Sequence, residues 1–371
     1  MLYIYNMELR YIATVVLHAL GDTIGFKNGD WEFNYDEKVV TLSTTNELMY
    51  EFIALGGINE INLENWTVSD DTIINMAMIK GILNSKKEVT EEMMINIKTE
   101  LVNAYNKIHE DEKIGIKRFP GVATNKYIRK FEEGHDGRDL PYDKMSGGNG
   151  AAMRTSCIGL AYYGMEKRDV LIKAAIETSR LTHNSAIGYL GGLAVAYFTA
   201  LAIEGIDIEE WPFLLIKLLS SSKVKSFIKT DEEGEDHEIY INYWQKYIDT
   251  RFENNKPIVS RAQANLVYRT KYHFENFTKD TASTFIGENG YSGPIMAYDS
   301  LLDGRYAWEK VIIYSALHSG DSDTVAAIAG SWYGAIYGFG DVPEKNLRYL
   351  EFKGELENLG KLLYSKYYLD I

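Results

Sequence analysis

The sequence predicts an all-α protein that folds as a single compact multi-helix domain. Apolar residues recur at the 3.6-residue spacing of amphipathic helices along most of the chain, whereas the only strand-like run is short and isolated, at 39–42. Proline is rare, with 6 residues in 371, and no Pro/Ser-rich linker divides the chain. We therefore expect one domain over residues 1–371, long enough to bury a sizeable core.

Five helices can be placed from their patterns. The first has its apolar stripe over 9–20 and is expected to end at Gly21. The second begins at Thr90, with two glutamates in its first turn. The other three span roughly residues 168–179, 186–204 and 324–337.

The segments between these helices are assigned by their polarity. The polar stretches 131–143 and 229–237 are expected to be surface loops, and the weakly patterned stretch 254–293 a long excursion near a site. The uncharged segment 185–203 approaches the length of a membrane span. Its three glycines and its polar residues favour a buried helix instead.

Composition limits the functional class. The formal net charge of −14 argues against binding to nucleic acid or to an anionic membrane, because both need basic surfaces. The single cysteine, Cys157, excludes an internal disulfide and is typical of a reducing compartment. We expect a cytoplasmic monomer that binds neither nucleic acid nor a membrane.

Two predicted helices begin with acidic residues. The sequences Ser69-Asp70-Asp71 and Asp321-Ser322-Asp323-Thr324 each precede an apolar, small-residue run. One interpretation is two solvated helix caps, since serine and aspartate suit a helix N-terminus. The other brings the two ends together, so that four carboxylates and two hydroxyls offer hard oxygen ligands to Mg²⁺, with Mn²⁺ or Ca²⁺ as alternatives. Spacing alone leaves both interpretations open.

A glycine-rich stretch and a histidine are further candidates. Residues 144–150 read Lys-Met-Ser-Gly-Gly-Asn-Gly, which either cradles an anion with backbone N–H groups or simply connects two helices. A P-loop and a Rossmann fold are rejected, because the Lys-Ser/Thr ending and a preceding strand are missing. His183 either contacts a ligand or satisfies neighbouring backbone.

Together these motifs resemble the ADP-ribosylglycohydrolase family, and most closely its ADP-ribosylarginine hydrolase branch. The matching pieces occur in the family's order and span almost the whole chain: 21–25, 31–33, 66–72, 147–154, 180–183 with 188–191, 294–299 and 320–330. The resemblance implies an all-α fold with a binuclear Mg²⁺ centre in a cleft. It also implies hydrolysis of the N-glycosidic bond that joins ADP-ribose to arginine on proteins, with ADP-ribose as the product.

The resemblance also implies roles for individual residues. The metal ligands would be Ser69, Asp70, Asp71, Asp321, Asp323 and Thr324. The diphosphate and adjacent ribose would be held by Lys144, Ser146, Gly147, Gly148, Asn149 and Gly150, with Gly121 at a phosphate-side turn and His183 contacting the ligand. The chain departs from the family at Ser319, where a glycine is usual, at 184–186 and at 281–293, so the shape of the ligand pocket and the preferred leaving group are affected.

The chemistry implied is attack of water on the anomeric carbon through an oxocarbenium-like transition state. Asp70 or Asp71 would act as general base, and Glu32 would assist departure of the guanidine; a solvated loop residue is the alternative for Glu32. Other hypotheses keep the same ribose site but change the outcome. They are hydrolysis of ADP-ribosylserine or O-acetyl-ADP-ribose, and a non-catalytic ADP-ribose-binding protein.

Overall fold

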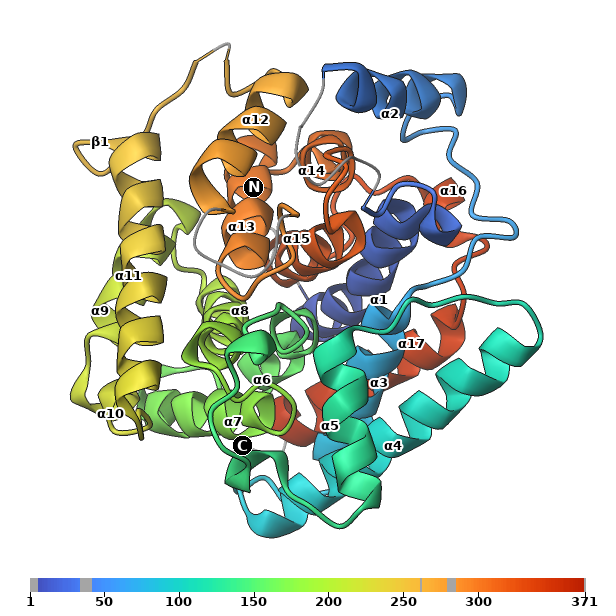
Figure 1. Ribbon diagram of the computed structural model, residues 1–371. Helices are drawn as coiled ribbons and strands as arrows, with labels where there is room; N and C mark the ends of the chain where they lie inside the picture. Colours follow the sequence, from blue (N-terminus) through green and yellow to red (C-terminus); the bar gives the residue numbers. More distant parts are fainter. Residues whose placement is uncertain (1–5, 34–41, 261, 279–284, 370–371) are drawn as a thin grey trace.

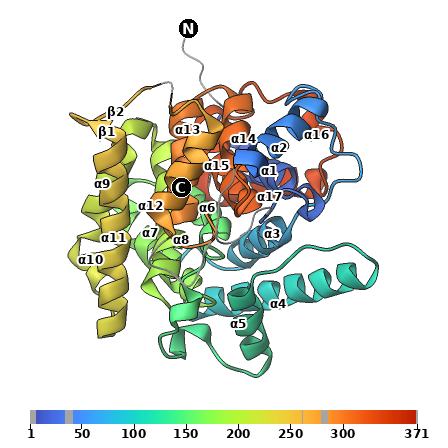
Figure 2. The same ribbon diagram turned by 45° about the horizontal axis from the view of Figure 1, so that its top comes forward.

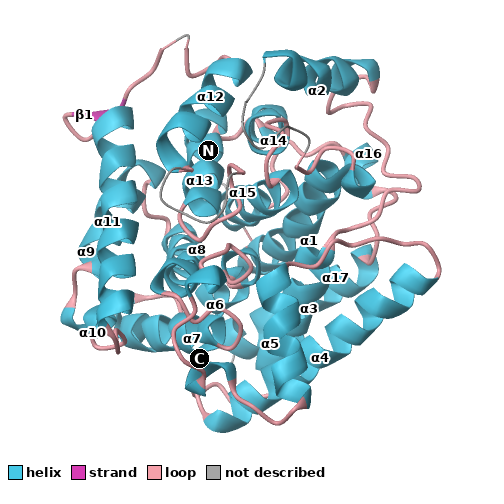
Figure 3. Cartoon of the chain, in the orientation of Figure 1, coloured by secondary structure: helices cyan, strands magenta, loops and turns pink. Residues whose placement is uncertain are grey.

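Helices make up nearly all of the regular structure in the computed structural model, which describes residues 6–33, 42–260, 262–278 and 285–369 (Figures 1 and 3). Among these residues the only sheet is an antiparallel pair of two-residue strands, β1 (Phe252–Glu253) and β2 (Lys256–Pro257). The predicted all-α fold is confirmed. The strand-like run at 39–42 lies outside the described residues except for Leu42, which begins a helix.

The helices have the following bounds. They are α1 (Met7–Phe26), α2 (Leu42–Ala54), α3 (Asp70–Leu83), α4 (Glu91–Lys113), α5 (Val122–Glu132), α6 (Ser156–Ala161), α7 (Arg168–Arg180), α8 (Ala186–Glu204), α9 (Trp211–Leu219), α10 (Ser222–Lys225), α11 (Asp231–Arg251), α12 (Leu266–Phe277), α13 (Ser292–Gly304), α14 (Trp308–Ala316), α15 (Ser322–Tyr337), α16 (Glu344–Leu347) and α17 (Lys353–Tyr364). All five predicted helices are among them.

Three groups of helices surround the centre of the molecule. Helices α3, α4 and α5 lie on one side, α7, α8, α9 and α11 on another, and α12, α13 and α14 on a third (Figures 1 and 2). The pair α1 and α15 passes between them. This arrangement brings the N-termini of α3 and α15, far apart in sequence, toward the same region.

The uncharged helix α8 is the core of the second group. It is the one described helix that is long and apolar enough to cross a membrane, and every residue of its apolar window is buried inside the protein. The interpretation as a buried core helix is therefore confirmed by its packing. Its glycines allow close contact with neighbours, because a Cβ at Gly192 would lie 2.1 Å from the Ser179 hydroxyl oxygen.

The prediction that Gly21 ends the first helix is wrong, because α1 continues through it to Phe26. A Cβ at Gly21 would lie 2.1 Å from the carbonyl oxygen of Ala326, and one at Gly25 would lie 2.3 Å from that of Ser322. These glycines therefore let the backbones of α1 and α15 touch. Their lost helix propensity, about 1 kcal/mol each, is offset by this packing.

The prediction of a surface loop at 229–237 is also wrong. Helix α11 begins at Asp231, and its first turns bury carboxylates against polar partners. Arg180 donates to Glu233 at 2.7 Å, and the Ser185 hydroxyl donates to Asp236 at 2.5 Å. Some of the charged residues in this stretch are therefore buried and paired with polar partners, rather than exposed to solvent. The stretch 131–143 is mostly turns beyond Glu132, and 254–293 contains α12 before it reaches the site.

Candidate active site

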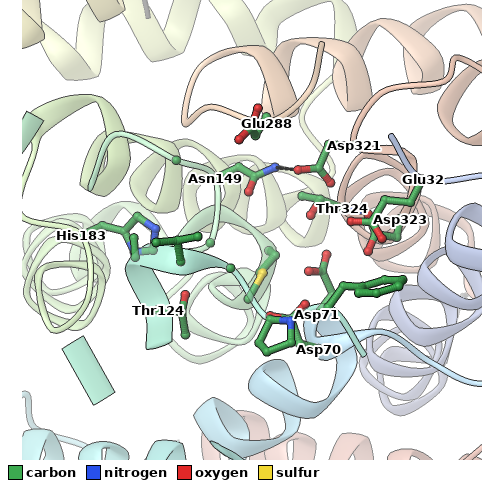
Figure 4. A pocket seen from close by; sticks show the side chains of 18 of the residues that line it. Glu32, Asp70, Asp71, Thr124, Asn149, His183, Glu288, Asp321, Asp323 and Thr324 are labelled. Atoms are coloured by element: carbon green, nitrogen blue, oxygen red, sulfur yellow. Dashed lines mark hydrogen bonds between the residues drawn. The ribbon is translucent and has the colours of Figure 1, made fainter. Parts of the chain in front are cut away.

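A cavity of about 460 Å³ opens where the three groups of helices meet (Figure 4). Its walls include the first residues of α3 and α15, the loop 148–150 and His183. The two acidic helix starts, which sequence spacing could not place, therefore converge on one cavity. Asp70 and Asp71 face Glu32, Asp323 and Thr324 across it, while His183 and Thr124 lie at the opposite end.

The start of α3 is fixed by a carboxylate from another helix. Ser69 caps α3, its hydroxyl accepting from the Asp71 N–H at 3.1 Å. Asp22 of α1 accepts from the N–H of Ser69 at 3.0 Å and of Thr72 at 3.1 Å, and from the Thr72 hydroxyl. Burial raises the pKa of Asp22 to about 6. Asp22 was not among the predicted site residues, although a buried aspartate within the matching piece 21–25 is consistent with such a role.

The start of α15 holds the second acidic group. Asp321 precedes the helix and accepts from the Asn149 side-chain amide at 2.9 Å. Ligand oxygens of Glu32, Asp321 and Asp323 all lie within 4.8 Å of one another. Ser319, just upstream, has a φ of +65°. This left-handed conformation explains why glycine is usual there, since a serine must bear the strain.

These carboxylates repel one another in a buried setting. Burial, followed by the charge of neighbouring carboxylates, holds the pKa values of Glu32, Asp70, Asp71 and Asp323 well above their usual range. One oxygen of Asp71 is buried without a hydrogen-bond partner. No lysine or arginine in the described part of the chain forms an ion pair with any of the four. A cation bound among these carboxylates would offset their mutual repulsion.

The donor set fits a hard divalent cation. All candidate ligands are oxygens, and Mg²⁺, Mn²⁺ and Ca²⁺ prefer carboxylates and hydroxyls. Asp70, Asp71, Asp321, Asp323 and Thr324 line the cavity, as the metal-site interpretation requires. Ser69 is buried beneath it as the helix cap and is not among the lining residues. Glu32, predicted as a proton donor, lies within the acidic group and is also a candidate ligand.

The opposite end of the cavity is less charged. Gly148, Asn149 and Gly150 line it, and a Cβ at Gly150 would lie 2.9 Å from the His183 ring. His183 is buried, its Nδ1 is 2.8 Å from the Thr182 hydroxyl, and burial lowers its pKa to about 3. A neutral imidazole therefore faces the cavity beside backbone that a ligand can approach closely.

The remaining predicted residues divide into those at the wall and those behind it. Gly121, the N-cap of α5, lines the cavity. Lys144 is exposed and is not a lining residue. Ser146 is buried and donates to the Asp143 carbonyl at 2.7 Å, while the Gly147 carbonyl accepts from Gly290 at 3.0 Å. Lys144, Ser146 and Gly147 are therefore not among the residues that line the cavity, although Asp143 and Met145 beside them are.

Further residues line the cavity that were not predicted from the sequence. Thr124 and Lys126 of α5 and Glu288 before α13 line the cavity. None belongs to a recognisable motif, and their sole signal is proximity in sequence to Gly121 and to the excursion at 254–293. Their position depends on how α5 and the segment before α13 cross the loop 148–150, which only the fold determines.

The fold and cavity define an all-α protein with a buried cluster of oxygen ligands beside an anion-compatible glycine loop. A sequence profile described as ADP-ribosylglycohydrolase matches residues 5–370. An ADP-ribosyl glycohydrolase of Acanthamoeba polyphaga mimivirus is 36% identical over 373 residues, covering 95% of this chain and 71% of that protein. The chain belongs to the ADP-ribosylglycohydrolase family and is a hydrolase of ADP-ribosyl conjugates.

Other relatives agree with this assignment. ADP-ribosylhydrolase ARH1 of Dictyostelium discoideum is 32% identical over 373 residues, covering 94% of this chain and 91% of that protein. Human ADP-ribosylhydrolase ARH3 is 29% identical over 300 residues, covering 74% and 72%. A solved structure described as an ADP-ribosylglycohydrolase-related protein complex superposes with a TM-score of 0.59 at 18% identity, covering 98% of this chain and 99% of that one. That likeness shows a shared fold.

Proposed function

We propose that this protein hydrolyses the N-glycosidic bond between ADP-ribose and arginine on modified proteins, with two Mg²⁺ ions as cofactor. One observation carries the proposal. The acidic starts of α3 and α15 line the same cavity as the loop 148–150 and His183. A single ligand can therefore place a ribose at the acidic end and its anionic part at the other.

Arginine as the leaving group is supported by similarity. The motifs of this chain resemble the ADP-ribosylarginine hydrolase branch most closely. The ARH1 relative is 32% identical and aligns with 94% of the chain, whereas the human ARH3 relative is 29% identical and aligns with 74%. Seven acidic residues and one lysine supply the charged side chains among the described lining residues, which favours a cationic guanidinium over a neutral serine or acetyl group.

The proposed chemistry assigns each proton. Water attacks the anomeric carbon of the ribose, and the bond from that carbon to the guanidine nitrogen breaks. Asp70 or Asp71 accepts the proton that the water loses, and Glu32 supplies the proton that the departing nitrogen gains. Burial and neighbouring carboxylates raise the pKa values of all three groups, which favours the protonated form that a proton donor such as Glu32 needs.

Divalent cations, when bound, would polarise the ribose hydroxyls and lower the pKa of water. The residues that would hold them are Asp70, Asp71, Asp321, Asp323 and Thr324. Asn149 orients one of these ligands through its hydrogen bond to Asp321, and Asp22 fixes the helix start that presents two others. Positioning by these neighbours should contribute much of the rate.

The test compares three substrates with and without cations. Release of ADP-ribose is measured from an ADP-ribosylarginine protein, an ADP-ribosylserine peptide and O-acetyl-ADP-ribose, in Mg²⁺ and in EDTA. We expect fastest turnover of the arginine conjugate and none in EDTA. Faster turnover of the serine or acetyl compound would show that arginine is not the preferred leaving group. Full activity in EDTA would show that hydrolysis does not require a divalent cation. Binding of ADP-ribose without hydrolysis of any conjugate would indicate a non-catalytic binding protein.

The role of Glu32 requires its own experiment, because it lies beside Asp321 and Asp323. Single-turnover hydrolysis by Glu32→Gln is followed together with Mg²⁺ affinity. A slower rate with unchanged affinity supports proton donation to the leaving nitrogen. A loss of affinity indicates a ligand, and an unchanged rate removes Glu32 from the chemistry.

We further propose that the protein acts as a monomer in the cytoplasm, on ADP-ribosylated protein substrates. Its one cysteine, Cys157, is buried and free, which is compatible with a reducing compartment. Sedimentation of the purified protein and localisation of a tagged copy test the two statements separately.

A further inference from the structure

The charges that line the cavity are unevenly distributed. The described lining residues include seven carboxylates, five of which gather around the starts of α3 and α15. Lys126 is the one lysine or arginine among them. An ADP-ribosyl group carries a diphosphate, and the proposed function places the ribose at the acidic end and the diphosphate at the other end. The location of Lys126 is therefore informative about how such a ligand is oriented.

Lys126 is held at the wall by a carboxylate. It lies on α5, two residues after the lining Thr124, and its Nζ is 2.7 Å from Asp143 Oδ2. The other oxygen of Asp143 accepts from the Met145 N–H at 3.0 Å, at the start of the glycine-rich stretch. Asp143 thus fixes both the lysine and the loop. An ammonium has three donors, so this pair leaves others for a ligand.

A second cation lies beneath the same wall. Arg154 is fully buried and donates to the carbonyls of Gly150 at 2.9 Å and Thr178 at 3.1 Å, while its Nε has no hydrogen-bond partner. The other buried arginines of the described chain, Arg118, Arg180, Arg251 and Arg269, all pair with carboxylates. Arg154 forms no such pair. Its uncompensated charge reaches across the Gly150 peptide group, because buried charges are weakly screened.

We propose that Lys126, oriented by Asp143, is the side-chain cation that binds the diphosphate of the ADP-ribosyl group, and that Arg154 reinforces this subsite from behind. This inference rests on the proposed function and refines it. It transfers to Lys126 the role that resemblance gave to Lys144, whose side chain is exposed and is not among the lining residues. It also orients the substrate, with the diphosphate beside α5 and the anomeric carbon beside α3 and α15.

The test compares Lys126→Ala with a matched control, Lys130→Ala. Both lysines lie on α5 and pair with a carboxylate, Lys130 with Glu133 at 2.6 Å, but Lys130 does not line the cavity. ADP-ribose affinity is measured by calorimetry in Mg²⁺ at low and high salt. We expect Lys126→Ala to raise Kd about tenfold at low salt, and less at high salt, because the lost contact is charge-assisted. Lys126→Arg should recover most of the affinity, and Lys130→Ala should change Kd less than about twofold.

Steady-state kinetics provide a second measurement. Because the diphosphate contact is made equally in the ground and transition states, Lys126→Ala should raise KM about tenfold and leave kcat within about twofold. Equal affinities of Lys126→Ala and Lys130→Ala would overturn the inference. A tenfold loss in Lys144→Ala without one in Lys126→Ala would return the role to Lys144. If the wild type neither binds ADP-ribose nor hydrolyses a conjugate, the proposed function fails as well.

Discussion

Two buried clusters of charge in this molecule are constructed in opposite ways. Behind the site, Arg251 and Arg269 each pair with both Asp299 and Asp303 at 2.5 to 2.7 Å, and His273 lies 3.3 Å from Asp299. These residues join α11, α12 and α13. The cavity, by contrast, gathers Glu32, Asp70, Asp71, Asp321 and Asp323 without a basic partner in the described chain.

The pKa values of the two clusters follow from this difference. Burial alone would raise the pKa of Asp299, but the charges of Arg251 and Arg269 outweigh it and hold that pKa well below its usual range. In the cavity, burial and like charges act together and raise the pKa of Asp71 and its neighbours. Equal burial thus accompanies a charge-balanced network in one place and a cluster of like charges in the other. The first supports the fold and the second is available for chemistry.

The largest expected effect comes from removing one carboxylate of the cavity. Asp71→Ala should lower kcat for the arginine conjugate by at least about a thousandfold, because cation binding and proton acceptance both depend on this residue. Its unfolding free energy in EDTA should stay equal or rise, since a repelling buried charge is lost. Asp231→Ala, at the exposed first turn of α11, is the control and should keep full activity. Marked unfolding of Asp71→Ala in EDTA would contradict the comparison.

The corresponding change in the balanced network should affect stability instead. Asp299→Asn leaves Arg251 and Arg269 short of a buried partner, so we expect the unfolding free energy to fall by about 3–5 kcal/mol. The folded fraction should retain its kcat, because the network lies outside the cavity lining. Urea unfolding and activity per folded molecule check both statements. A kcat loss as large as that of Asp71→Ala would show that the two clusters are not independent.

The stabilisation that Mg²⁺ gives in thermal unfolding should depend on the cavity carboxylates and not on the network around Asp299. Mg²⁺ at 100 times its Kd should stabilise the wild type by about 2.7 kcal/mol relative to EDTA, since only the folded state has the site. Asp299→Asn should show the same increment from its lower baseline, whereas Asp71→Ala should show a much smaller one. Equal Tm values of the wild type in Mg²⁺ and EDTA would mean that the acidic cluster binds no Mg²⁺.

The smallest effect concerns a group buried as a neutral species. Burial lowers the pKa of His18 to about 4, and its Nε2 is 2.6 Å from the Met153 carbonyl. The unfolded pKa is about 6.5, so the contribution of His18 is present above that pH and is lost as the pH falls. At pH 5 the loss should be about 2 kcal/mol. Urea unfolding of His18→Gln in excess Mg²⁺ should show a weaker decline with pH, and exposed His135→Gln an unchanged one.

Helix periodicity and capping were sufficient to predict the fold class and the starts of several helices. Thr90 caps α4, its hydroxyl accepting from Met93, and Ser69 caps α3, as their positions before apolar runs predict. Errors arose where a residue's role depends on a distant partner. Gly21 is typical of a helix end in isolation, and only contact with α15 explains it as an interior residue.

In the site, too, local features could be recognised from the sequence, whereas roles that depend on a distant partner could not. Both acidic helix starts could be recognised locally, but spacing could not decide whether they meet. Asp22 lies in the matching piece 21–25, but its role depends on hydrogen bonds to residues at the start of α3, which are distant in sequence. Lys126 belongs to none of the matching pieces, and its partner Asp143 lies outside its helix. The ligand contact expected of Lys144 stays a prediction: its side chain is exposed and is not among the cavity-lining residues, which helix periodicity could not indicate because residues 144–146 form a 3-10 turn.

The glycine contact between α1 and α15 also has a consequence for biosynthesis. Until translation has passed Ser322, the emerging chain holds only one of its two acidic helix starts, and the closely packed face around Gly21 and Gly25 has nothing to dock against. Hydrolytic competence should therefore arise only after α15 has been synthesised. Shorter forms of the chain that lack α15 should accordingly be unable to hydrolyse a conjugate.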